Sequence, residues 1–232
     1  NGNGRGCRSR RSTRWSAAIT NARAGAYLCT RCVEEDVDFH GMSYWRREHQ
    51  LPGLYSCPKH GGSLGYVETR RAFLSPPSAF YDHHHVVDGA WVEKLQRSAP
   101  TQRYLSIAAD LLARAGSVDE RDVSRAARAR AIELGLHTGR GAVARELISD
   151  RIKTQFDPTW LASVIPGWIE KLDGKLWRPV DGALFGKRSG VSSTVYAIAF
   201  ASLFESSDQA INAMLTPLRR ENTRAPGHKK KV

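Results

Sequence analysis

The spacing of apolar residues along the chain takes up a helical period after Pro100. Apolar side chains then recur every three or four residues, which is typical of a helix that buries one face. The residues with this spacing are Tyr104, Leu105, Ala108, Leu111 and Leu112. Gly116 is expected to end this helix, because glycine is a common helix terminator.

A second helix is predicted to begin at a capping box formed by Ser117 and Glu120 and to end near Gly135. After a turn at residues 137–141, a third helix is predicted over residues 142–156. Arginines line this pair of helices, so it is a candidate helix-turn-helix. Amphipathic helix pairs are also common in domains that bind no DNA, and the pattern does not separate the two interpretations.

The remaining pattern completes a mostly α chain. Asp157 caps a helix that has Pro158 at its first position. A long final helix is predicted from about Ser192 to Leu215, because its apolar residues continue through this segment. We therefore expect a multi-helix domain at residues 101–216.

Before these helices, two pairs of metal-ligand residues have the same short spacing. Cys29 and Cys32 form one pair and Cys57 and His60 the other, so each pair fits one tight knuckle. Three thiolates and one imidazole complete a tetrahedral shell, which predicts one structural Zn²⁺ ion in a small zinc-ribbon-like module. Disulfides are the weaker alternative, because a histidine stands where a fourth cysteine would be needed.

Other residues of the module receive structural predictions. His40 and His49 lack the spacing of His60 and are interpreted as structural. Tyr44 and Trp45 lie midway between the ligand pairs and are predicted to form the core of the module. A module of this size buries little surface, so metal binding would supply part of its folding free energy. The adjacent acidic residues Glu35 and Asp36 are expected to stabilise the following turn.

Residues 29–64 carry a resemblance to a known family. The sequence combines Cys-x-x-Cys and the following Glu-Asp with Tyr-Trp-Arg-x-x-His-Gln-Leu-Pro-Gly at residues 44–53 and Cys-Pro-x-His-Gly-x-x-Leu at residues 57–64. It resembles the TniQ family, which includes the TnsD target selectors of bacterial transposons. Thr30 stands where the family usually has proline. Family members generally carry a further N-terminal region, so the chain resembles a truncated or N-terminally divergent member.

The resemblance implies a role in transposition without catalysis. A protein of this family would help to select the insertion site on double-stranded DNA and recruit the machinery, including a transposition ATPase regulator of the AAA+ type. In the alternative it is a protein-protein adaptor that links this regulator to a separate DNA-reading complex, such as a guide-RNA effector complex. It would act in the bacterial cytoplasm, at the nucleoid.

The charge of the chain agrees with a polyanionic partner. The formal net charge is +12 over 232 residues, and such an excess attracts nucleic acid. Residues 1–26 form a predicted basic flexible arm with a free thiol at Cys7, and residues 217–232 form a basic tail. Either end can contact phosphate or simply be solvated. The predicted DNA contacts are Arg46, Arg47, Arg125, Arg128 and Arg140.

Residues 69–100 are predicted to be a linker between the zinc module, at residues 27–68, and the helical domain. The segment Ser75–Ser78 contains two prolines, which should interrupt any regular element there. The run His83-His84-His85 is interpreted as a polar loop, since consecutive side chains of an extended segment point to opposite faces and do not converge on one ion.

Catalysis and membrane insertion are both disfavoured by the sequence. Phosphoryl transfer usually needs carboxylates that converge on metal ions, and the acidic residues here are dispersed. The chain has no Gly-x-x-x-x-Gly-Lys-Ser/Thr phosphate loop. No apolar run approaches the roughly 18 residues that span a bilayer, so the chain is expected to be soluble, with no membrane partner.

Overall fold

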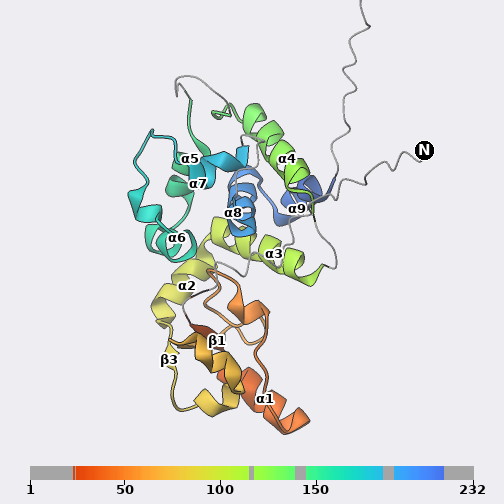
Figure 1. Ribbon diagram of the computed structural model, residues 1–232, viewed down its shortest axis with the longest axis vertical. Coiled ribbons are helices and arrows are strands. Elements are labelled where there is room, and N and C mark those ends of the chain that lie inside the picture. The colour runs from red at the N-terminus through yellow and green to blue at the C-terminus, as the bar shows by residue number, and fades with distance from the viewer. Residues whose placement is uncertain (1–22, 24, 115–117, 139–144, 185–190, 217–232) are drawn as a thin grey trace, which may run out of the picture.

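The computed structural model describes residues 23, 25–114, 118–138, 145–184 and 191–216. Within these residues the fold is mostly helical, with a small sheet and a Cys₃His cluster near the N-terminus (Figure 1). The prediction of a mostly α protein with a small cysteine- and histidine-bearing module is therefore confirmed. None of the helices in the described ranges is long and apolar enough to cross a bilayer.

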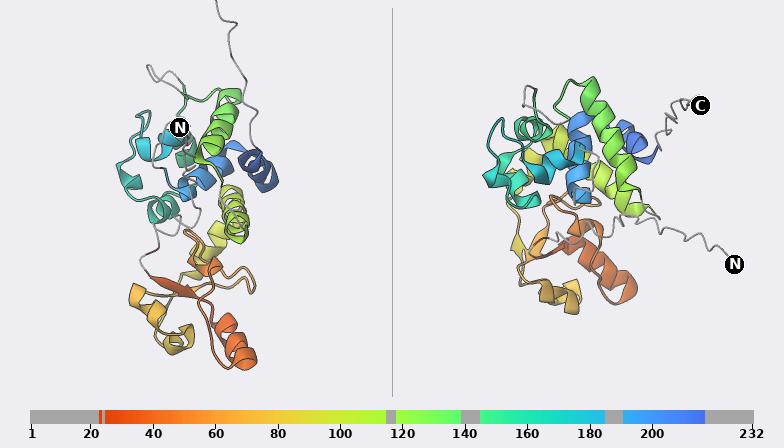
Figure 2. Two further views of the ribbon diagram at one scale, coloured as in Figure 1. Left: turned by 45° about the vertical axis from the view of Figure 1, so that its right-hand side comes forward. Right: turned by 45° about the horizontal axis from the view of Figure 1, so that its top comes forward.

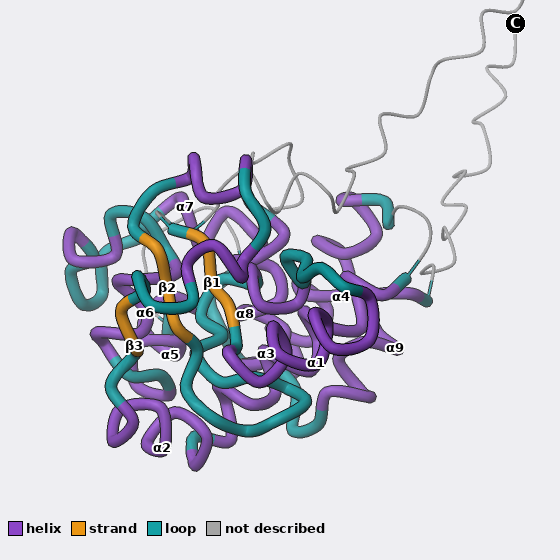
Figure 3. Tube along the Cα trace, turned by 90° about the horizontal axis from the view of Figure 1, so that it is seen from below, coloured by secondary structure: helices purple, strands orange, loops and turns teal. Residues whose placement is uncertain are grey.

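The sheet of the described residues has three short antiparallel strands in the order β1 (Ala26–Leu28), β2 (Gly65–Val67) and β3 (His85–Val86), which lie side by side in Figure 3. Tyr27 lies opposite Tyr66, and their rings stack with centroids 5.7 Å apart. His84 packs so closely on Gly65 that an added Cβ would lie 2.2 Å from the imidazole. The prediction of a polar loop at residues 83–85 is therefore wrong at His85, which pairs with β2.

Short helices surround this sheet. They are α1 (Thr30–His40), η2 (Glu48–Gln50), η3 (Arg70–Leu74), η4 (Pro77–Phe80) and α2 (Gly89–Arg97). Residues 69–100, expected to be a linker, thus contain a strand and three helices. The division of the chain into five parts stays a prediction.

The apolar core of this N-terminal part is small. It comprises Ala26, Leu28, Val33, Val67 and Ala72, and a second small cluster contains the three cysteines. Trp45 packs against the first cluster and donates a hydrogen bond to the Ser75 carbonyl at 2.8 Å. Tyr44 is 48% exposed, so its prediction as a core residue is wrong.

The rest of the described chain forms a helical body around one buried helix. Its elements are α3 (Ala99–Ala113), α4 (Glu120–Glu133), α5 (Ile148–Gln155), α6 (Pro158–Val164), η5 (Trp168–Glu170), α7 (Arg178–Asp181), η6 (Gly182–Leu184), α8 (Ser193–Leu203) and α9 (Ser207–Leu215). Every residue of α8 is buried, because α3, α4, α5 and α9 all pack against it (Figures 1 and 2).

Three helix boundaries differ from the predictions. The second helix begins at Glu120, where Asp119 rather than Ser117 is the cap; Ser117 lies outside the described residues. The third helix was predicted from residue 142; residues 139–144 lie outside the described part of the chain, and the helix begins at Ile148, after the non-helical residues 145–147. The long final helix is broken between α8 and α9, where the Ser206 hydroxyl accepts a hydrogen bond from the Gln209 amide and caps α9.

The break at residues 204–206 lets α9 fold back against α3 and α4. This return buries Ile211 and Met214. A helical apolar period continues through both helices, so the period alone does not reveal the turn between them.

The N-terminal part contacts the helical body through α2, whose Leu95 belongs to the large core cluster of the body, and through the loop at residues 51–55. The Tyr104 hydroxyl donates to the Pro52 carbonyl at 2.8 Å, and the Trp160 indole donates to the Gly53 carbonyl at 3.0 Å. Gly53 has a φ of 78°, and an added Cβ would lie 2.6 Å from the Trp160 ring. Glycine is therefore required at this contact.

Candidate metal centre

The four predicted ligands come from two different local structures. Cys29 follows β1 directly and is the N-cap residue of α1, and Cys32 lies in the first turn of that helix. The positive end of a helix dipole favours thiolates at this position. The first pair therefore lies at a helix start and not on a knuckle, which corrects the prediction for that pair.

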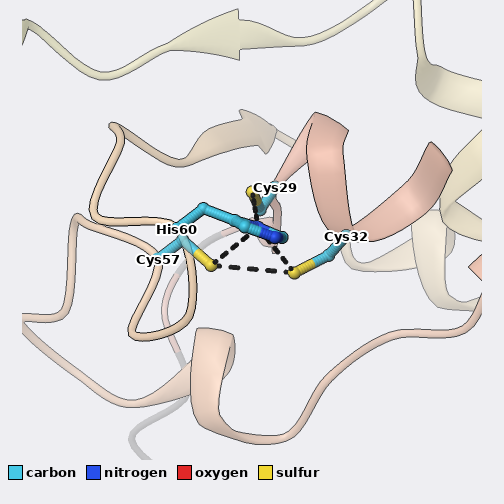
Figure 4. Close-up of side chains that lie close together, drawn as sticks. All are labelled: Cys29, Cys32, Cys57 and His60. Carbon is cyan, nitrogen blue, oxygen red and sulfur yellow. Dashed lines mark hydrogen bonds between the residues drawn. The ribbon is translucent and has the colours of Figure 1, made fainter. Parts of the chain in front are cut away.

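The second pair does lie on a tight turn. The Cys57 amide donates to the Gly62 carbonyl at 2.8 Å, and the Gly61 amide donates to the Cys57 carbonyl at 2.8 Å. Gly61 has a φ of 71°, which suits glycine. This turn brings Cys57 and His60 to the side of α1 that carries the other two ligands (Figure 4).

The distances between the ligand atoms match a tetrahedral shell. His60 Nδ1 lies 3.4 Å from Cys29 Sγ, 3.4 Å from Cys32 Sγ and 3.7 Å from Cys57 Sγ. Cys32 Sγ lies 3.7 Å from Cys57 Sγ, and all four atoms are within 4.8 Å of one another. A tetrahedron with Zn–S bonds of about 2.3 Å has edges of about 3.8 Å between sulfurs.

The cluster therefore fits a metal ion, and its donor set of three thiols and one imidazole is that of structural zinc sites. Burial raises the pKa of the Cys29 and Cys32 thiols. In the absence of a cation both would hold their protons at neutral pH. A bound Zn²⁺ would displace these protons and cross-link α1 to the Cys57–His60 turn.

Glu35 supports the cluster from behind His60. Its Oε1 lies 3.0 Å from His60 Nε2, which places the ring proton on Nε2 and leaves the Nδ1 lone pair free to face the thiols. Lys59 also binds Glu35, and the hydrogen bonds from Lys59 and then from His60 lower the pKa of this carboxyl group. The sequence reasoning missed this role. Glu35 lies three residues after Cys32. A helix predicted to begin at the first cysteine pair would therefore have placed Glu35 on the same side as Cys32, close to the cluster.

Asp36 and Arg46 form a partly buried ion pair beside the cluster. Arg46 Nη2 donates to Asp36 Oδ1 at 2.7 Å, and the Asp36 side chain is only 4% exposed. His49 is buried near this pair, and burial lowers its pKa to about 4, so the imidazole is neutral at pH 7. His49 is not among the four clustered residues, and exposed His40 ends α1.

The predicted DNA contacts fall in different surroundings. Arg46 is held by Asp36, and exposed Arg47 Nη2 donates to the Leu112 carbonyl at 3.4 Å. On α4, Arg125 pairs with Asp122 and Arg128 is exposed. Arg140 and Cys7 lie outside the described residues.

The fold and the cluster together define a protein in which a small module with a Cys₃His cluster that fits a metal ion is joined to a helical body. The TniQ family model matches residues 2–64, which include all four clustered residues. The chain therefore contains a TniQ family domain over these residues. TniQ is a transposition target-selection family, and its proteins are accessory factors that are generally non-catalytic. No curated protein matches the chain.

Proposed function

We infer that this chain is a non-catalytic DNA-targeting protein of transposition. It holds one structural Zn²⁺ ion at Cys29, Cys32, Cys57 and His60, binds duplex DNA, and helps to choose the insertion site at the bacterial nucleoid. It recruits the transposition machinery through an AAA+ regulator. The observation that carries this proposal is the TniQ family domain with its complete Cys₃His cluster. Four protein ligands leave no open position for a reacting water, which supports a structural metal.

The face proposed to contact DNA is the outer side of α4. Arg121, Arg125 and Arg128 recur at intervals of four and three residues, so they share one side of the helix. They extend over about 10 Å at a rise of 1.5 Å per residue. The opposite side, with Val123, Ala127 and other small residues, is buried against the body. This arrangement supports phosphate contacts, and reading of a groove by a helix-turn-helix stays a prediction.

One observation favours the adaptor alternative: the two module arginines that were predicted to contact DNA are already bound within the protein. Arg46 is held by Asp36, and Arg47 binds a carbonyl of α3. Two of the four predicted DNA contacts in the described residues therefore serve the fold itself. In this alternative, DNA or a guide-RNA effector complex is read by another protein, and the chain links that protein to the AAA+ regulator.

The test is fluorescence anisotropy of the zinc-loaded chain on labelled duplex DNA over a salt series. Direct targeting predicts a steep fall of affinity with salt, since each phosphate contact contributes a slope of about 0.9. The double variant Arg125→Gln/Arg128→Gln should lower this slope by about 2. Weak wild-type binding with almost no slope, together with binding to the AAA+ regulator, would establish the adaptor alternative instead.

A matched control removes the same charge elsewhere. Arg71 is exposed like Arg128, and Arg97 pairs with Glu93 as Arg125 pairs with Asp122. The variant Arg71→Gln/Arg97→Gln should leave the salt slope close to that of the wild type. An equal loss in both double variants would show that net charge, and not the α4 face, determines DNA affinity.

A further inference from the structure

The far end of α1 exposes a strip of large apolar side chains. Phe39 is 84% exposed, Met42 63%, Tyr44 48% and Val37 38%. We call these four residues and Asp38 the α1 tip. The rings of Phe39, His40 and Tyr44 follow one another, with centroid distances of 4.7 Å and 6.0 Å, so the aromatic part of the strip is continuous. Clustered exposed apolar residues mark interaction sites, whereas scattered ones need no explanation.

The local fold explains why these side chains stay outside the core. The buried side of α1 is occupied by Cys32, which belongs to the Cys₃His cluster, by Val33, which packs with the sheet residues, and by Asp36, which binds Arg46. Gly41, with a φ of 72°, ends the helix and turns the chain back. The side chains on either side of this turn, Phe39 and Met42, therefore lie outside the small core of the module and are exposed.

Asp38 gives the α1 tip a carboxylate, in a chain of net charge +12. The other three carboxylates of α1 have partners: Glu34 accepts a hydrogen bond from the Tyr81 hydroxyl, Glu35 binds Lys59 and His60, and Asp36 is held by Arg46. Asp38 lies in the last turn, where the helix dipole is negative and an acidic side chain is unfavourable. Asp38 has no ion pair within the described part of the chain. A cation supplied from outside would relieve this repulsion.

The α1 tip is far from the arginine face. α1 and α4 lie towards opposite ends of the long axis of the molecule in Figures 1 and 2. The Asp38 carboxylate would also repel phosphate. A partner at the α1 tip can therefore be bound while α4 contacts DNA.

We propose that the α1 tip binds a protein segment that presents apolar side chains next to lysine or arginine. The apolar strip supplies contact area, and Asp38 with the negative end of α1 selects a basic neighbour. The binding chemistry follows from these residues alone. That the segment belongs to the recruited transposition machinery rests on the function proposed above.

The experiment uses the full zinc-loaded chain and a fluorescein-labelled amphipathic helical peptide built of leucine and lysine. Phe39→Ser/Met42→Ser should weaken binding of this peptide by about tenfold or more, as is usual when central apolar contacts are removed. Asp38→Lys should weaken it as well, and a peptide of leucine and glutamate should bind the wild type more weakly. Zinc content and circular dichroism establish that each variant is folded.

The helical body offers a matched control pair. Ile169 is 87% exposed and Leu172 57%, close to the values for Phe39 and Met42. The carboxylate beside them, Asp173, already binds Lys153. Ile169→Ser/Leu172→Ser should change peptide affinity by less than about twofold, as expected for residues outside a binding site.

Several results would overturn the proposal. They are no binding of the leucine–lysine peptide to the wild type, an equal loss in the control pair, or a parallel loss of DNA affinity in the α1 tip variants. Absence of DNA binding by the wild type, with peptide binding intact, would instead contradict the proposed direct DNA targeting and leave the α1 tip assignment in place.

Discussion

The metal-binding module and the helical body are stabilised in different ways. In the module, one cluster has five buried apolar residues, and three of the five buried residues in the other are the clustered cysteines Cys29, Cys32 and Cys57. The body has a single large cluster around the buried helix α8, and Leu95 of α2 also belongs to this cluster. In the proposed function the module would therefore depend on a cation held by the Cys₃His cluster, whereas the body depends on side-chain packing.

Loss of a metal ion from the Cys₃His cluster should therefore destabilise the module while the helical body stays folded, because the body is stabilised by its own packing. The two regions meet at the loop at residues 51–55, where Tyr104 and Trp160 of the body bind the backbone of Pro52 and Gly53, and along α2, whose Leu95 belongs to the large cluster. This loop leads directly to Cys57. A metal ion at the proposed site would therefore act on the body through the position of residues 51–55.

The largest effect is expected from loss of a metal ligand. Cys57→Ser should release the ion and unfold the module, because structural zinc contributes about 10–16 kcal/mol in small zinc domains. The helices of the body should remain. Zinc content and hydrogen exchange of residues 26–67 and 193–203 measure the two outcomes separately. Cys7→Ser is the control, and one zinc per chain in Cys57→Ser would contradict the assignment.

A large effect on the other region is expected from Phe200→Ala. Phe200 is fully buried in α8 and stacks on Phe204 with centroids 5.5 Å apart. The cavity should lower the free energy of unfolding of the body by about 3–5 kcal/mol, without loss of zinc. Urea unfolding followed by circular dichroism measures this change. The exposed counterpart Phe39→Ala should change stability by less than about 0.5 kcal/mol. Equal effects would mean that the two regions share one core.

The smallest effect is expected at the contact between the regions. Gly53→Ala must move the Trp160 ring, from which its Cβ would lie 2.6 Å, and it strains a backbone with positive φ. We expect a loss of about 2 kcal/mol, with zinc retained and faster hydrogen exchange in residues 51–55. Gly174→Ala also has a positive φ but meets nothing within 4 Å, so it should cost about 1 kcal/mol. A similar loss in both variants would show that the contact with Trp160 contributes no stability.

Much of this architecture could be predicted from local pattern. The spacing of Cys29, Cys32, Cys57 and His60 predicted the cluster, and the structure brings these four residues together. The helical period predicted a mostly α second half, and Asp157 caps α6 as expected. These features depend on neighbours within a few residues, so the sequence displays them directly.

Features that depend on distant residues could not be predicted in this way. The break at residues 204–206 follows from the packing of α9 on α3 and α4, and the exposure of Tyr44 follows from how the module turns after Gly41. Arg46 was predicted to contact DNA, and its partner Asp36 lies ten residues away on another element.

The sequence by itself determined the Cys₃His cluster, the helical class and the basic charge, because residue type and short spacing specify them. Only the tertiary structure decided which arginines are free to face a partner, which carboxylate supports His60, and which side of α1 is exposed. Those properties depend on which surfaces are buried when distant segments pack together, and burial is a property of the whole fold.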